Sequence, residues 1–240
     1  MKTYKKILYI IFITGIATLI CLDVVSQNGQ QVMQSSIYNN KLPLLIIDAG
    51  HGGEDGGAVA SDGTVEKEIN LNIAEQVYSL SLLLGFDSLM TRCSDDALSD
   101  KTLSTIRERK MSDIDARMKI LSEHKEGCLL SIHQNQFADR TCSGMQVFYS
   151  ENNEMSQPLA SSIQSYTINN LQKENTRKIK PTTDDIYMLK HANNPAVMVE
   201  CGFMSNENEL QNLKNQRYGT KIAMCILFGV LDASNPERNI

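Results

Sequence analysis

Three side chains that can bind a metal or transfer protons, His51, His133 and Glu200, each lie just behind a short apolar run. Apolar runs of this length that end in polar residues are typical of buried strands that lead into loops. In an open α/β sheet the carboxyl ends of neighbouring strands meet at one crevice, where ligands bind. We therefore expect the three residues to share one site. The runs that precede them are residues 44–47, 128–132 and 196–199.

Glycines around His51 strengthen the expectation of a ligand site there. A lone histidine behind a strand is more often a loop or core residue than a ligand. Here, however, two of only four histidines occupy equivalent positions. Glycines gather where the backbone turns tightly or approaches a ligand closely. Those beside His51 are Gly50, Gly52, Gly53, Gly56 and Gly57.

Two histidines leave one ligand position to fill, because a catalytic zinc takes three protein ligands and a water. Glu66 lies where the glycine-rich segment meets the next predicted helix, so its side chain can turn back over the strand end. The alternative is that Glu66 only favours the helix N-terminus electrostatically, and the residues alone leave both interpretations open. The carboxylates that qualify by type are Asp48, Glu54, Asp55, Asp62, Glu66 and Glu68.

Strands that alternate with helices predict one α/β domain around a mostly parallel, twisted central sheet flanked by helices. The segment 94–110 is expected to be an exposed loop or irregular helix, and Ser112 with Asp115 forms a weak capping box. Strands are predicted at 44–47, 86–91, 128–133, 145–149, 186–189 and 196–200. Helices are predicted at 67–84 with Gly85 as C-cap, 112–123, 159–171, after a cap at Ser205 or Asn206, and at 221–231.

The N-terminus has the layout of a targeting segment. Lysines precede an apolar stretch that ends at residue 22, which indicates either a cleaved signal peptide or an uncleaved membrane anchor over residues 1–22. Residues 23–41 then form a polar linker, and residues 42–235 form the domain, which lies outside the cytoplasm in either case. The cysteines do not form a disulfide framework, although spacing leaves a Cys93–Cys142 pair open. The net charge of −5 argues against nucleic-acid binding.

Five sequence blocks resemble the zinc-dependent N-acetylmuramoyl-L-alanine amidases of the amidase-3 family, and the resemblance extends from about Leu44 to Leu231. It implies Zn²⁺ bound by His51, Glu66 and His133, with Glu200 as the catalytic carboxylate. It also implies a six-stranded central sheet and peptidoglycan muramyl peptides as substrate. The blocks are residues 48–53, 56–58, 63–68, 131–135 and 199–206.

The middle of the chain is similar to the germination-specific members of that family, which remove peptides from muramic acid so that muramic-δ-lactam forms in the spore cortex. The similar segments are 143–149, 177–181 and 185–189. The chain departs from the family at Gln134 and Gln136, where small residues are usual, at Ala49, where Pro is usual, and at Cys201. The glutamines border His133 and leave the substrate specificity open.

Three further residues are candidate substrate contacts. Asn135 is either a second-layer or substrate contact or a loop-capping amide. Arg117 and Arg177 could bind carboxylates of the stem peptide, although a solvated surface charge is the default for each. These assignments rest on residue type and position only.

Two other classes of function compete with the amidase interpretation. A zinc peptidase or carboxypeptidase acting on another cell-wall amide could use the same four residues, and only the cleavage position separates it from an amidase. A wall-binding module without activity is disfavoured because Glu200 and all three expected ligands are present. Whether a protein activator is needed cannot be deduced from the sequence.

Overall fold

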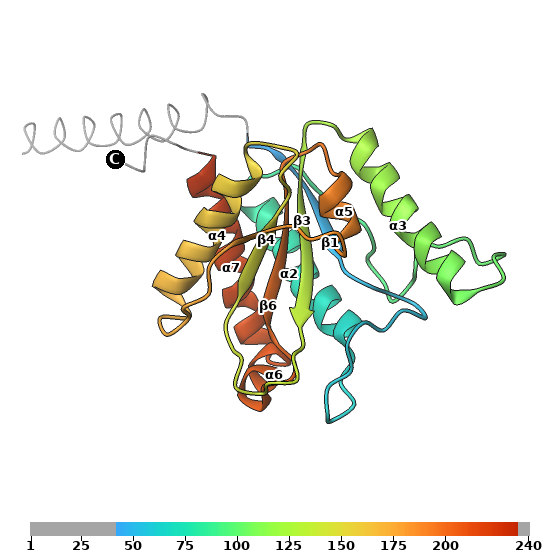
Figure 1. Ribbon diagram of the computed structural model, residues 1–240. Coiled ribbons are helices and arrows are strands. Elements are labelled where there is room, and N and C mark those ends of the chain that lie inside the picture. Colours follow the sequence, from blue (N-terminus) through green and yellow to red (C-terminus); the bar gives the residue numbers. More distant parts are fainter. Residues whose placement is uncertain (1–41, 235–240) are drawn as a thin grey trace, which may run out of the picture. The chain divides into compact units, whose positions relative to one another are not determined.

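Six strands form a single sheet in the order β2-β1-β3-β6-β4-β5 in the computed structural model, which describes residues 42–234 (Figure 1). Neighbouring strands are parallel except for β4 and β6, so the predicted α/β class and mostly parallel sheet are confirmed. The predicted leader and linker, residues 1–41, lie outside the described residues. The strands are β1 Leu44–Ala49, β2 Ser88–Met90, β3 Gly127–Asn135, β4 Gln146–Tyr149, β5 Lys180–Pro181 and β6 Ala196–Phe203.

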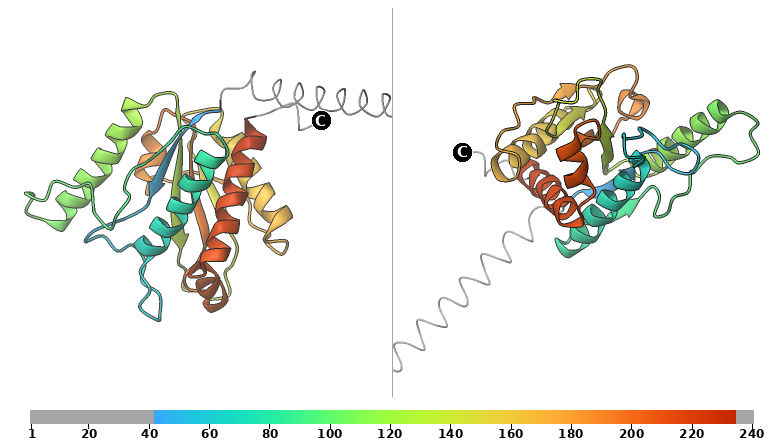
Figure 2. Two further views of the ribbon diagram at one scale, coloured as in Figure 1. Left: turned by 180° about the vertical axis from the view of Figure 1, so that it is seen from behind. Right: turned by 90° about the horizontal axis from the view of Figure 1, so that it is seen from below.

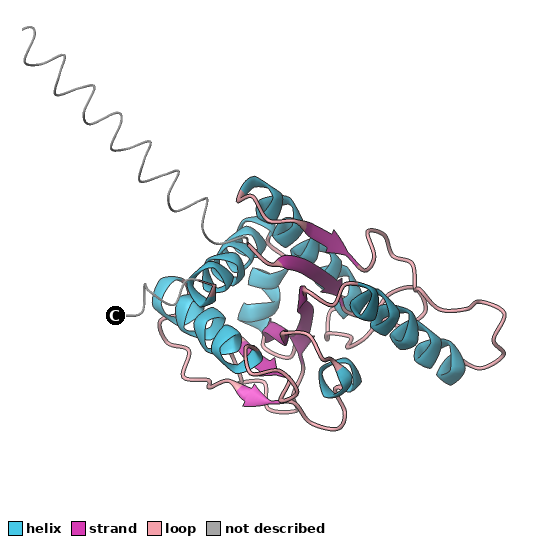
Figure 3. Cartoon of the chain, turned by 90° about the horizontal axis from the view of Figure 1, so that it is seen from above, coloured by secondary structure: helices cyan, strands magenta, loops and turns pink. Residues whose placement is uncertain are grey.

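Helices cover the two faces of this sheet unequally. Helices α2, α4 and α7 lie across one face, whereas α3 and the short α5 lie on the other (Figures 1 and 3). Seen from behind, α2 and α7 run side by side across the strands (Figure 2, left). None of the helices in residues 42–234 is long and apolar enough to cross a membrane. Their bounds are α2 Glu66–Leu83, α3 Ile106–Glu123, α4 Ser156–Asn170, α5 Tyr187–His191, α6 Glu207–Leu213 and α7 Gln216–Ala233.

Strand alternation divides the core into two apolar clusters. In β1, Leu45 and Ile47 belong to the larger cluster under α2, α4 and α7, whereas Ile46 between them belongs to the smaller one. This follows because successive side chains of a strand point to opposite faces. The smaller cluster is completed by Leu121 of α3 and Leu189 of α5. The face under α3 and α5 is therefore the less covered one.

The sheet has a topological switch point between β1 and β3. The chain leaves β1 through α2 to reach β2 on one side, then returns through α3 to β3 on the other side. Helix α2 and helix α3 pack on opposite faces. Ligands in open α/β sheets bind at such points. His51 and His133 lie at the ends of these two strands.

Two secondary-structure predictions, one for α3 and one for α5, are wrong. The sequence predicts a strand at residues 186–189, but Ile186 is the N-cap of α5 and the next three residues begin this helix, because an apolar run this short does not distinguish helix from strand. The sixth strand is instead the two-residue β5. Helix α3 begins at Ile106, six residues before the predicted start, because Thr105 and Glu108 form the capping box. Asn206 is the N-cap of α6, which confirms one of the two caps predicted from the sequence, Ser205 or Asn206.

The contact between α7 and α4 depends on the absence of a side chain at Gly229. A Cβ atom there would lie 2.5 Å from Ile163 Cα, which is backbone and cannot move aside. At Gly219 of the same helix, the equivalent atom would meet only the end of the Gln76 side chain, at 2.7 Å. The two glycines therefore differ in what a methyl group would displace.

We predict that Gly229→Ala lowers the free energy of unfolding by about 1–3 kcal/mol, the usual cost of overpacking. Gly219→Ala serves as the control, because it makes the same change in the same helix. It should be neutral or stabilising, since Ala favours a helix over Gly by up to about 1 kcal/mol. Denaturant unfolding measures both. Equal stability changes in the two variants would contradict the described packing of α7 on α4.

Candidate metal site

A row of polar side chains crosses the less covered face of the sheet near the strand ends. His133 of β3 is the register partner of Glu200 in β6, and Glu200 is the register partner of Gln146 in β4. Register partners in adjacent strands point to the same face. Gly50, which directly follows β1, lies beside His133, and a Cβ atom at this position would lie 2.2 Å from the imidazole. The imidazole therefore lies over a backbone that only glycine allows.

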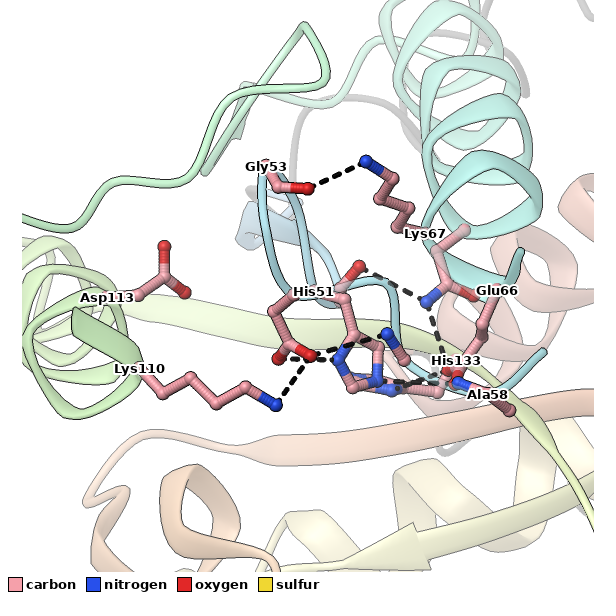
Figure 4. Close-up of polar contacts among 12 residues, drawn as sticks. His51, Gly53, Ala58, Glu66, Lys67, Lys110, Asp113 and His133 are labelled. Atoms are coloured by element: carbon pink, nitrogen blue, oxygen red, sulfur yellow. Dashed lines mark hydrogen bonds and ion pairs between the residues drawn. The ribbon is translucent and has the colours of Figure 1, made fainter. Parts of the chain in front are cut away.

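His51 reaches the same place from the loop after β1. It is the only non-glycine residue with a positive φ, 61°, in the part of the chain that the structure describes. Its Nδ1 atom lies 2.9 Å from Asp55 Oδ2, and Asp55 Oδ1 lies 2.8 Å from Lys110 Nζ of α3. Asp55 thus holds the imidazole by one nitrogen and leaves Nε2 directed at Glu66, 3.3 Å away (Figure 4).

Glu66 joins the two histidines from the first turn of α2. Its Oε1 atom lies 3.1 Å from His133 Nδ1, and its Oε2 atom faces His51. The carboxylate also accepts hydrogen bonds from the Ala58 N–H, the Gln134 N–H and the Asn70 side chain. Burial alone would raise the pKa of Glu66, but the two histidines outweigh it and hold the pKa far below the usual value. Glu66 is thus an anchored, ionised carboxylate.

The donor set of these residues fits a transition metal. His51, Glu66 and His133 each offer one ligand atom, and these atoms all lie within 4.8 Å of one another. Two imidazoles and one carboxylate are a ligand set that catalytic zinc accepts. Gly57 keeps the space free, because a Cβ atom there would lie 2.6 Å from both Glu66 Oε2 and His51 Cδ2.

Glu200 lies beside this cluster without belonging to it. Its Oε2 atom is buried and has no hydrogen-bond partner among residues 42–234. Burial raises the pKa of Glu200 to about 7, although the neighbouring His133 acts in the opposite direction. A carboxylate with an unused oxygen and a pKa near neutrality can accept and return a proton.

Arg117 is neither a solvated surface charge nor an available anion contact, contrary to the two alternatives that the sequence allowed. Its side chain is 3% exposed. The guanidinium is bound to Asp48, at 2.5 Å, and to Asp113, at 2.6 Å, and it also donates to the carbonyls of Ala49 and His51. These contacts occupy four of its five N–H donors within the protein, and the side chain is nearly inaccessible.

Four of the other five candidate carboxylates near His51 have partners of their own, whereas Glu68 is exposed on α2. Asp48 is buried with Arg117, Glu54 pairs with Arg109, and Asp62 pairs with Lys214. Asp55 does not face Glu66 and His133 as a third ligand but holds His51 from behind. Of the six carboxylates considered, Glu66 is the one brought together with both histidines.

Arg177 lies at the far end of the polar row, beside Gln146, whereas Asn135 follows His133 in β3. The Arg177 guanidinium lies 4.1 Å over the centre of the Phe203 ring, donates to the Ser143 carbonyl at 2.7 Å, and reaches Gln146 Oε1 at 3.3 Å. It has no ion-pair partner in the described residues, unlike Arg109 and Arg117. Asn135 is the register partner of Phe203 and is partly exposed.

A pocket continues from the histidines along the open face towards α3 and α5. Its floor is formed by the register partners Asp48, Ser131 and Met198 of three adjacent strands. Lys110 of α3 and Tyr187 of α5 contribute to its walls. The two histidines of the candidate metal cluster therefore line a pocket on the sheet face.

Sequence reasoning missed Asn70, Arg92 and Gln146. Asn70 follows Glu66 by four residues on the same helix, and this spacing places both side chains on one face, so the signal was available. Arg92 donates to the carbonyls of Ala49 and Gly50, which no local pattern indicates. Gln146 acquires its position only through the antiparallel register of β4 with β6.

We predict that Gly57→Ala weakens divalent-metal binding more than Gly63→Ala does. Both glycines have a positive φ, 69° and 86°, so both variants pay a similar backbone strain of about 1–2 kcal/mol. Only at Gly57 does the added methyl group meet Glu66 and His51, whereas at Gly63 nothing lies within 4 Å. Competition with a chelating dye measures both affinities. Equal losses in both variants would show that space at Gly57 does not matter for the cluster.

Comparison with known proteins finds relatives over most of the described residues. The model of the N-acetylmuramoyl-L-alanine amidase family matches residues 45–232. The germination-specific N-acetylmuramoyl-L-alanine amidase of Bacillus subtilis is 32% identical over 188 residues, which are 78% of this chain and 78% of that protein.

Solved structures of amidases have the same fold. The CwlD amidase from Clostridioides difficile, solved in complex with the GerS lipoprotein, is 36% identical with a TM-score of 0.76, over 80% of this chain and 98% of that chain. An N-acetylmuramoyl-L-alanine amidase from Clostridium difficile 630 is 26% identical with a TM-score of 0.67, over 80% and 96% of the two chains. With nearly all of its described residues matched, this chain is a member of the N-acetylmuramoyl-L-alanine amidase family.

Proposed function

We propose that the protein is a zinc-dependent hydrolase that cleaves the amide bond between N-acetylmuramic acid and the L-alanine of peptidoglycan stem peptides. The observation that carries the proposal is the cluster of His51, Glu66 and His133 beside the unpartnered oxygen of Glu200. Membership of the amidase family supports the same substrate. The open pocket beside the cluster gives a polymeric substrate access to it.

In this proposal the three ligand residues hold one zinc ion and Glu200 moves the proton. Zinc bound by His51, Glu66 and His133 would supply Lewis acidity for the scissile carbonyl and the attacking water. Glu200 Oε2 accepts the proton of that water and returns it to the amine of the leaving L-alanine. Asp55 keeps a proton on His51 Nδ1 and so directs Nε2 towards the metal.

Two substrate contacts, Arg177 and Asn135, are proposed near the polar row. Arg177 is fixed by Phe203 and Ser143 but has no ion-pair partner in the described residues, so it suits a carboxylate of the stem peptide. Asn135 follows His133 by two residues in β3, beyond a register shift, and suits a peptide or sugar amide. Arg117 is not part of this set because it is buried and engaged.

The biological setting is proposed by similarity. The Bacillus subtilis relative is a germination-specific amidase, and we assign this chain to spore cortex maturation, where muramic-δ-lactam forms. The site of action is then outside the cytoplasm, with residues 1–22 as an export signal or anchor. CwlD was solved with a lipoprotein, and a partner of that kind belongs to the proposal for this chain.

The products of cell-wall digestion test the reaction. Mass spectrometry of peptidoglycan incubated with the zinc-loaded protein should show glycan with peptide-free muramic acid and released peptides that begin with L-alanine. Products that retain L-alanine on muramic acid and are cut further along the stem would establish the peptidase alternative instead. Deletion in the native host should abolish muramic-δ-lactam, and normal lactam levels would reject the cortex assignment but not the amidase.

We predict that zinc binding releases at least about one proton at neutral pH. Burial would lower the pKa of His51, but its hydrogen bonds to Asp55 and Glu66 outweigh burial and raise the pKa to about 9 in the metal-free protein. Zinc needs the neutral imidazole. The apparent affinity should therefore rise about tenfold per pH unit and level off above about pH 9. Titration calorimetry in buffers of different ionisation enthalpy measures this, and an affinity independent of pH would contradict it.

A second prediction separates binding from chemistry at Glu200. Glu200→Gln keeps the shape of the side chain but removes the proton acceptor. Turnover should fall by about two to four orders of magnitude, while zinc content and melting temperature stay near those of the wild type. Substantial activity in a fully metallated Glu200→Gln sample would remove Glu200 from the proposed mechanism.

A further inference from the structure

Two buried arginines bind three consecutive backbone carbonyls at the end of β1. The Ala49 carbonyl accepts from Arg92 Nε at 2.8 Å and from Arg117 Nη1 at 2.9 Å. The Gly50 carbonyl accepts from Arg92 Nη2 at 3.0 Å, and the His51 carbonyl accepts from Arg117 Nη2 at 2.7 Å. We call this set of contacts the carbonyl clamp. It ends on the residue whose imidazole lies in the candidate metal cluster.

The clamp is fixed from outside the loop. Arg117 is held by Asp113 of its own helix and by Asp48 of β1. Arg92 donates to the carbonyls of Ser94 and Lys67, which belong to the segment after β2 and to α2. Both guanidiniums are nearly inaccessible, with exposures of 4% for Arg92 and 3% for Arg117. Because several elements fix the positions of the two guanidiniums, the position of the loop after β1 depends on the sheet and helices around it.

The loop needs such support because His51 adopts a backbone conformation that side chains disfavour. Its φ is 61°, in the left-handed region where non-glycine residues are uncommon. Such conformations persist when the surroundings over-determine them. Here Arg117 holds the His51 carbonyl from one side, and Asp55 holds the imidazole from the other. The direction of Nε2 towards Glu66 and His133 depends on both.

We propose that Arg117 and Arg92 are positioning residues that set the metal affinity of the site by holding the 49–51 carbonyls, in addition to stabilising the fold. This inference rests on the metal site of the proposed function. Neither arginine touches substrate or metal in this account. Arg117 acts through the carbonyl of His51 and Arg92 through the carbonyls of the two residues before it, as outer residues of metal sites act through the ligands they orient.

Arginine-to-lysine variants separate the clamp from the buried charge. Lysine keeps a positive charge near Asp48 but lacks the planar fork of donors, so it cannot serve Asp48, Ala49 and His51 in their fixed directions. Arg117→Lys and Arg92→Lys should each weaken zinc binding by about 10–100-fold, the usual effect of removing an orienting partner. The affinity is measured by chelator competition on the full-length protein, alongside the melting temperature without metal.

Leu121→Ala is the matched control. Leu121 is also on α3 and is 2% exposed, but it packs in the smaller apolar cluster and donates nothing to the loop. It should lower the melting temperature while leaving the zinc affinity within about threefold of the wild type. That tolerance is small beside the effect expected for an orienting residue. If Leu121→Ala weakens zinc binding as much as Arg117→Lys at an equal loss of melting temperature, the role of Arg117 is only structural.

A milder variant keeps the test decisive if the lysine variants do not fold. Asp113→Asn loosens the anchor of Arg117 Nε while leaving Arg117 paired with Asp48, and it should weaken zinc binding measurably with a smaller loss of stability than the lysine variants. Unchanged affinity in every folded clamp variant would overturn the inference. Absence of zinc binding by the wild-type protein would instead overturn the metal site of the proposed function.

Discussion

A single buried carboxylate, that of Asp48, joins β1 to β3, to α3 and to the segment after β2. Asp48 is 1% exposed and accepts hydrogen bonds from Thr91 after β2, from Ser131 in β3 and from Arg117 in α3. Burial would raise its pKa, but the Arg117 charge and the Ser131 hydroxyl outweigh burial and lower the pKa to about 2. Loss of one member of a buried ion pair typically costs about 3–5 kcal/mol, because the other charge remains unpaired. The path of the chain from β1 into the His51 loop depends on this contact.

The two faces of the sheet explain where the chemistry can occur. Helices α2, α4 and α7 seal one face over the larger apolar cluster (Figure 2). On the other face α3 and α5 leave a pocket that His51 and His133 line, and Glu200 and Gln146 follow His133 in register across the adjacent strands. Parallel register places these side chains on one surface, and the switch point between β1 and β3 adds His51. A long glycopeptide needs an open surface of this kind, whereas an enclosed cavity would admit only its end.

The sequence was sufficient to locate the strands that carry His51, His133 and Glu200, because apolar runs with polar ends are local signals. Glu66 was one of several possible ligands until the family resemblance selected it. Its position depends on the reciprocal contact of Glu66 with Ala58, which folds the glycine-rich segment back on itself. Arg117 could not be interpreted from the sequence because its main partner, Asp48, is 69 residues away. Helix α5 was mistaken for a strand because its apolar run is too short to show a period.

X-ray diffraction from crystals of the zinc-loaded protein, recorded on both sides of the zinc absorption edge, tests the central claim most directly. The account predicts one strong anomalous peak bounded by His51 Nε2, Glu66 and His133 Nδ1, with Glu200 next to the metal but not bound to it. A peak at any other place in the domain would contradict the assignment. So would a zinc ion bound directly by Glu200 in place of one of the three expected ligands.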